Sequence, residues 1–151
     1  MDVTVRDATA NDLPILFEHQ QDPEATRMAA FPPRDWDRFV AHWTNIIADD
    51  TLTAKTVLVD GQVAGNAVSW DGPTGREVGY WIGREFWGRG IATLALMEVV
   101  REVEIRPLFA HVAKHNIGSR RVLEKCGFKV VSEGRVDDVD EFVLRLDAEN
   151  D

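Results

Sequence analysis

The residues best suited to bind a charged ligand form a glycine-bearing turn ahead of an expected helix. A strand-like run over residues 77–82 leads to Gly88 and Gly90, and the apolar positions after them recur at helical spacing. The first turn of a helix presents unpaired backbone N–H groups and the positive end of the helix dipole, which together favour an anion. The two glycines let the backbone approach a phosphate, because neither has a Cβ. The sequence therefore predicts a phosphate site made by Trp87, Gly88, Arg89, Gly90, Ile91, Ala92 and Thr93.

The glycine spacing argues against two common nucleotide sites. It matches neither G-x-x-x-x-G-K-[ST], which marks nucleotide triphosphatases, nor the dinucleotide pattern G-x-G-x-x-G. Within the turn, Arg89 adds a fixed positive charge and Thr93 adds a hydroxyl group. The alternative interpretation is an ordinary strand-to-helix turn without a ligand.

A second group of polar residues opens the next expected helix. This helix covers residues 116–126, and Gly127 follows at the position that favours a left-handed cap. Asn116 is a good N-cap for it, and Ser119 lies in its first turn.

Both groups resemble motifs of the GNAT acetyltransferase superfamily. The turn is similar to the pyrophosphate-binding pattern Q/R-x-x-G-x-G/A over residues 87–92, with Trp87 in place of the usual Gln or Arg. Trp at that place is familiar in the branch that resembles ribosomal-protein N-terminal acetyltransferases. Residues 116–128 resemble the N-x-x-S-x-x-V-L-x-K-x-G-F block of that branch, and Glu-Val-Gly-Tyr-Trp precedes the first motif. The resemblance covers essentially the whole chain, although its specific motifs lie between Glu77 and Phe128.

The resemblance implies a GNAT fold and an acetyl-CoA-dependent N-acetyltransferase that transfers the acetyl group directly to an amine. Strands over residues 77–82 and 108–112 would run parallel and splay apart, which would open a cleft for the pantetheine arm. Backbone groups of Trp81 and Ile82 would pair with that arm, and one N–H there would polarise the acetyl carbonyl. The pyrophosphate would lie on the amides of residues 87–93. Asn116 would hydrogen-bond the arm or the acceptor, with helix capping as its alternative role.

The groups that move protons are less well defined by the resemblance. Many GNAT enzymes carry a tyrosine general acid at the position of Leu123, so Ser119 near the sulfur, or water, is the fallback here. The alternative for Ser119 is a small residue of purely structural use. Glu77, at the start of the cleft strand, is the candidate base through water, with an exposed edge carboxylate as its alternative. Tyr80, the only tyrosine, is expected to pack rather than react.

The branch resemblance favours a protein N-terminal α-amine as acceptor, possibly on a basic protein. An α-amine has a reference pKa of about 8, against about 10.4 for lysine, so it loses its proton more readily. Two alternatives stay open: a small amine such as a polyamine or an antibiotic, and a non-catalytic acetyl-CoA-binding sensor module.

The elements that position these residues alternate between strands and helices. Strands are expected at residues 3–6, 56–59, 63–70, 77–82, 108–112, 128–131 and 141–146, the last two around an acidic turn at 137–140. Helices are expected after Asp12, from Asp35, after Gly90 and from Asn116. This order predicts an α/β (α+β) fold with a mixed, twisted sheet of about six to seven strands and helices on both faces.

Length and composition fit one domain spanning residues 1–151. With 26 Asp and Glu against 17 Lys and Arg, the net charge of -9 argues against a DNA-binding or anionic-membrane surface. Cys126 is the single cysteine, so no intramolecular disulfide is possible, and no ligand cluster predicts a metal site. No signal peptide or apolar run of about 20 residues is evident, so we expect a cytoplasmic protein; the oligomeric state is open.

Overall fold

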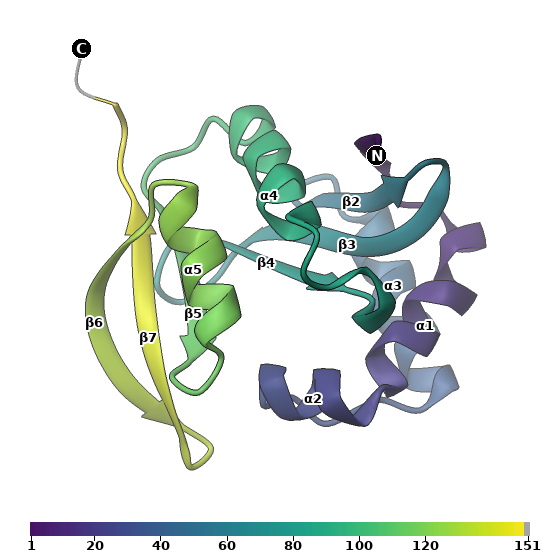
Figure 1. Cartoon of the computed structure of the whole chain (residues 1–151), viewed down its shortest axis with the longest axis horizontal. Helices are drawn as coiled ribbons and strands as arrows, with labels where there is room; N and C mark the ends of the chain where they lie inside the picture. Colours follow the sequence, from purple (N-terminus) through teal and green to yellow (C-terminus); the bar gives the residue numbers. More distant parts are fainter. Residues whose placement is uncertain (150–151) are drawn as a thin grey trace.

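The strands form one seven-stranded mixed sheet in the computed structural model, which describes residues 1–149 (Figure 1). The strand order is β1-β2-β3-β4-β5-β7-β6, and every neighbouring pair is antiparallel except β4 and β5. The predicted mixed sheet of six to seven strands is confirmed. The strands are β1 (Val3–Asp7), β2 (Thr53–Val59), β3 (Gln62–Asp71), β4 (Arg76–Ile82), β5 (Leu108–Ala113), β6 (Lys129–Val136) and β7 (Val139–Leu146).

Five α-helices accompany the sheet within the described residues, and several begin at side-chain caps. They are α1 (Leu13–Gln21), α2 (Pro23–Ala29), α3 (Trp36–Ala48), α4 (Ile91–Glu102) and α5 (Ile117–Lys125). Asp22 accepts a hydrogen bond from Ala25 N at the start of α2, and Asp35 accepts one from Arg38 N at the start of α3. Each cap satisfies a backbone donor that the helix itself leaves unpaired.

The helices cover both faces of the sheet, as the sequence predicted (Figure 1). On one face, Leu96 and Val99 of α4 and Leu123 of α5 pack with apolar residues of β4 and β5. On the other face, Leu16 of α1 packs with Phe39, which is fully buried on α3. The two faces of β4 therefore meet different helices, because side chains alternate along a strand.

The parallel pairing between β4 and β5 is short. Only Arg76 with Leu108 and Glu77 with Phe109 are paired, after which the two strands separate. The rest of β4 keeps its antiparallel partner β3 on its other side. The separation that the family resemblance implied is therefore present, and it opens toward the end of β4.

Two hairpins turn through paired residues with positive φ. Asp60 and Gly61 have φ values of 49° and 83°, and Asp137 and Asp138 have 48° and 64°. Such two-residue turns match the right-handed twist of the flanking strands. The acidic turn expected at 137–140 was too long. Strand β6 extends to Val136 and β7 begins at Val139, so the turn consists of Asp137 and Asp138.

Candidate functional site

A cavity of about 470 Å³ lies where β4 and β5 separate. Its walls come from α2, the end of β4, the loop before α4, the first turn of α4 and one side of α5. Elements from α2 to α5 thus meet beside the only parallel strand pair that the described residues contain.

The glycine-bearing turn forms one end of this cavity. Gly88 and Gly90 have φ values of 78° and 76°, in the left-handed region that favours glycine. Gly90 directly precedes α4, and a Cβ added at either glycine would meet no other atom within 4 Å. The turn is therefore an open cradle in front of backbone N–H groups, which suits a phosphate. Trp87, Gly88, Gly90, Ile91, Ala92 and Thr93 of the predicted site line the cavity.

Arg89 is the member of the predicted turn that does not line the cavity. It is exposed, and its guanidinium carbon lies 5.7 Å from the centre of the Phe86 ring. The positive charge expected from Arg89 is instead available from α5. Arg121 and Lys125 both line the cavity, one helical turn apart. Their spacing from Gly118, at three and seven residues, is the helical signal that could have found them.

The end of β4 supplies Tyr80, Trp81 and Ile82. Gly83 N donates to Ala64 O, so alternation along the antiparallel pair directs the backbone groups of Trp81 to β3 and those of Ile82 to the gap. The carbonyl of Ile82 accepts a 2.8 Å hydrogen bond from the indole of Trp87. Of the two backbone positions expected to pair with a ligand, Ile82 faces the gap, whereas Trp81 contributes its side chain.

The start of α5 places Asn116 and Ser119 on the cavity wall. Asn116 Oδ1 accepts from Ser119 N at 3.2 Å, so its capping role is present in the structure. The hydroxyl of Ser119 lies 2.7 Å from the hydroxyl of Tyr80. Burial raises the pKa of Tyr80 to about 12. Tyr80 was expected only to pack, and its position beside Ser119 is the main feature that the sequence did not predict.

Glu77 and Ser119 do not come together in the cavity. Glu77 lies where β4 and β5 are still paired and does not line the cavity. Its carboxylate is 3.1 Å from Nε2 of His111, and Nδ1 of His111 is 3.0 Å from the carboxylate of Glu141. Because Glu77 and Tyr80 are three residues apart on one strand, their side chains lie on opposite faces of the sheet.

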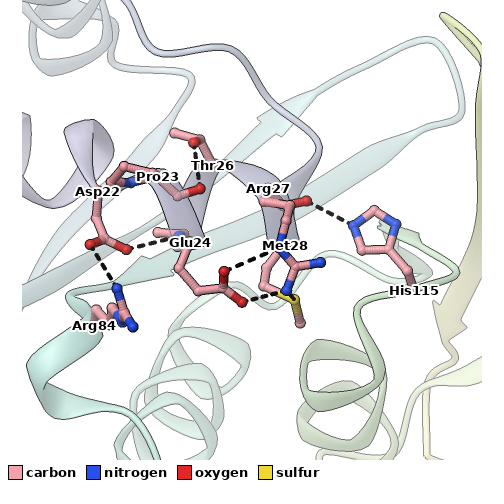
Figure 2. A network of polar contacts seen from close by, with 9 residues as sticks. Asp22, Pro23, Glu24, Thr26, Arg27, Met28, Arg84 and His115 are labelled. Atoms are coloured by element: carbon pink, nitrogen blue, oxygen red, sulfur yellow. Dashed lines mark hydrogen bonds and ion pairs between the residues drawn. The ribbon is translucent and has the colours of Figure 1, made fainter.

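Helix α2 forms the wall opposite α5 through Ala25, Met28 and Ala29. Figure 2 shows that α2 is attached near both of its ends. At its start, Asp22 accepts from Arg84 of the β4–α4 loop at 3.4 Å. Near its end, the carbonyl of Arg27 is 2.8 Å from Nε2 of His115, in the loop between β5 and α5. Since a carbonyl only accepts, His115 must carry its proton on Nε2 to make this bond.

The family model described as an acetyltransferase (GNAT) domain matches residues 2–129. The chain belongs to the GNAT acetyltransferase family. The predicted superfamily and the predicted enzyme class, an acyltransferase, are thereby confirmed. No curated protein sequence matches this GNAT protein.

Solved structures with the same fold include several acetyltransferases. One is the aminoglycoside acetyltransferase AAC(6')-Ib in complex with coenzyme A, with 17% identity, 97% of this chain and 95% of that chain covered, and a TM-score of 0.83. Another is spermidine N-acetyltransferase from Vibrio cholerae in complex with CoA and spermine, with 16% identity, coverage of 95% and 94%, and a TM-score of 0.84. A probable acetyltransferase is 25% identical, with coverage of 96% and 92% and a TM-score of 0.78. At these identities the likeness establishes the fold of the GNAT protein, not its acceptor.

Residues 1–149 show neither a candidate metal centre nor a candidate membrane span. No group of three or more His, Cys, Asp or Glu side chains in this range is arranged to hold a metal ion. None of the helices described is long and apolar enough to cross a membrane.

Proposed function

We propose that this GNAT enzyme transfers an acetyl group from acetyl-CoA to a small cationic amine, such as a polyamine or an aminoglycoside. The observation that carries the proposal is the cavity between β4 and β5, which ends at the glycine cradle in front of α4. A gap beside the part of β4 that no longer pairs with β5 suits an extended arm with amides, and the glycine cradle suits its phosphates.

Acetyl-CoA supplies the acetyl thioester, and the residues of the chain hold and orient it. The amides of residues 88–93 would bind the pyrophosphate, with Arg121 and Lys125 supplying positive charge nearby. The N–H of Ile82 would pair with the arm or donate to the acetyl carbonyl oxygen as negative charge develops there. Coenzyme A in two structures of the same fold supports this assignment.

The reaction needs a neutral amine and a proton for the departing sulfur. A bond forms between the amine nitrogen and the acetyl carbon, and the bond from that carbon to sulfur breaks. Overall the nitrogen loses one proton and the sulfur gains one. Ser119 is the hydroxyl that we assign to the sulfur, because it lines the cavity at the start of α5.

We assign the acceptor as a small amine rather than a protein N-terminus on the basis of structures with the same fold. The structures named above include an aminoglycoside acetyltransferase and a spermidine N-acetyltransferase bound to spermine, whereas the ribosomal-protein branch has no counterpart among them. The net charge of -9 attracts cationic acceptors of either kind over a range of about 10 Å at 0.1 M salt, so it supports a cation without choosing between the two. The proposal therefore replaces the protein N-terminal α-amine by the small amine that was its alternative.

Release of free thiol from acetyl-CoA with a panel of amines tests the proposal. Spermidine, spermine and kanamycin are compared by kcat/KM with a basic and an acidic peptide that have free N-termini. We expect the small polyamines or kanamycin to be acetylated fastest. A preference for the peptides would restore the N-terminal acceptor, and binding of acetyl-CoA without thiol release for any amine would indicate a sensor.

A further inference from the structure

Two hydroxyl groups from distant parts of the chain meet inside the cavity. Tyr80 comes from β4 and Ser119 from the first turn of α5, and their oxygens are 2.7 Å apart. Both residues line the cavity, and Tyr80 packs against the apolar cluster beneath α4 and α5. Nothing in the family motif discussed above requires this contact, because the motif position for a tyrosine holds Leu123, which is buried in the core.

The geometry favours one direction for the hydrogen bond between them. The oxygen–oxygen distance of 2.7 Å is ideal for two hydroxyl groups in either direction, but only when Tyr80 donates does the tyrosine proton lie on this short bond. In the opposite arrangement, Ser119 donates and the tyrosine proton is left with the carbonyl of Ser119 at 3.3 Å, a long contact. With Tyr80 as donor, the hydrogen of Ser119 remains free to point into the cavity.

We propose that Tyr80 is a positioning residue that aims the Ser119 hydroxyl at the departing sulfur of acetyl-CoA. The proposal rests on the acetyl-transfer function stated above. In it, Ser119 donates a hydrogen bond to the sulfur as negative charge develops there, and Tyr80 holds the serine in the donating orientation.

Neither hydroxyl has to lose its proton in this scheme. Because burial raises the pKa of Tyr80 to about 12, the phenol keeps its proton at neutral and mildly alkaline pH. A thiol has a reference pKa of about 8.5, so full transfer from this phenol to the thiolate would be unfavourable. The sulfur leaves as a thiolate stabilised by Ser119 and gains its proton from water, while the amine nitrogen releases one to water. The pair therefore acts by hydrogen bonding, like an oxyanion-type donor.

A double-mutant cycle with Tyr80→Phe and Ser119→Ala tests the coupling. Phe keeps the ring that packs in the core and removes only the hydroxyl. We expect Tyr80→Phe to lower kcat with spermidine, or with kanamycin if it is the faster acceptor, by about 5- to 10-fold, with the Kd for acetyl-CoA unchanged within about twofold. In the Ser119→Ala background, the same change should lower kcat by less than about twofold, because Tyr80 acts through Ser119. Ser132→Ala, which removes an exposed hydroxyl on β6, is the matched control.

A second measurement does not depend on any acceptor. Coenzyme A is titrated on the protein by the ultraviolet absorbance of its thiolate, as a difference from the protein alone. If Ser119 donates to the sulfur, the bound thiol should lose its proton at a pH at least about half a unit lower in the wild type than in Tyr80→Phe. Because Tyr80 is the only tyrosine, tyrosinate absorbance does not interfere below about pH 10.

The outcomes separate this proposal from the function on which it rests. Effects on kcat that multiply independently, or a bound thiol that titrates alike in both proteins, would overturn the role of Tyr80 while leaving acetyl transfer intact. Absence of thiol release with every amine would overturn the proposed function. The thiol titration would still show whether Ser119, held by Tyr80, donates to the sulfur of bound coenzyme A.

Discussion

Replacing Gly90 by Ala, beside a matched control, distinguishes a loss of phosphate binding from the backbone strain that any such change introduces. Gly90 has a φ of 76° and an open space where a Cβ would lie, directly in front of α4. Gly61, in the β2–β3 turn, has a φ of 83° and is equally open, but it does not line the cavity. Gly61→Ala is therefore the matched control for Gly90→Ala.

The two variants should lose similar stability and differ only in binding. A residue with a Cβ in the left-handed region costs about 1–2 kcal/mol, so both free energies of unfolding should fall by about that amount. In the proposed complex, the methyl group added at Gly90 would also occupy the path of the pyrophosphate. A hydrogen bond to a charged group contributes about 1.5–3 kcal/mol, so loss of one would raise the Kd for acetyl-CoA by about 10- to 150-fold.

Titration calorimetry with acetyl-CoA, together with urea unfolding of each variant, measures both quantities. We expect Gly61→Ala to bind acetyl-CoA with the wild-type Kd. If Gly90→Ala, while folded, binds acetyl-CoA as tightly as Gly61→Ala does, the cradle is not where the phosphates lie.

Three further predictions concern charge and hydrogen bonding. Asp12 is buried and hydrogen-bonded to Arg6 and Thr56, and mainly Arg6 holds its pKa well below the usual range. Asp12→Asn should therefore lower the free energy of unfolding, measured in urea, by about 2 kcal/mol at pH 7. Because the folded pKa is depressed, that stability is present above about pH 4 and is lost as the pH falls further, so equal losses at pH 7 and pH 3 would contradict the assignment. His115→Ala removes the hydrogen bond to the Arg27 carbonyl of α2. It should raise the KM for the amine about fivefold with little change in acetyl-CoA binding, and an unchanged KM would show that this bond does not help to position α2 for the amine. Lys125→Met should weaken acetyl-CoA binding about 3- to 10-fold at low salt and less at high salt, whereas Lys129→Met, on the exposed side of β6, should not; a salt-independent loss would point to packing instead.

The fold and the cradle could be predicted because their signals are local. The Asp60-Gly61 turn, the apolar residues at helical spacing in α3 and the glycines before α4 are each encoded within a few consecutive residues. Local geometry of this kind depends little on the rest of the chain. The acidic turn was misjudged because Asp140, although Asp is uncommon in strands, is part of β7 and pairs with Arg135 of β6.

The centre of the site could not be predicted in the same way. Tyr80 and Ser119 are 39 residues apart, and their contact depends on how α5 packs on β4. Glu77 shows a signal that was available, because the two-residue period of a strand already separates it from the face that carries Tyr80. The part of the cavity wall formed by α2 could not be predicted, because Ala25 and Met28 are apolar residues of a kind found in many helices.

The short pairing between β4 and β5 gives the sheet an edge in its interior. An edge strand with free N–H and C=O groups is a template on which a strand of another protein can add, and it promotes aggregation in many sheets. Here α2 lines the same cavity as the end of β4, and its two ends are attached to the loops on either side of the gap (Figure 2). Because α2 stands across the cavity from α5, we expect it to hinder another strand from pairing with this edge of β4. The same helix that forms a wall of the binding cavity would then also limit self-association through the gap.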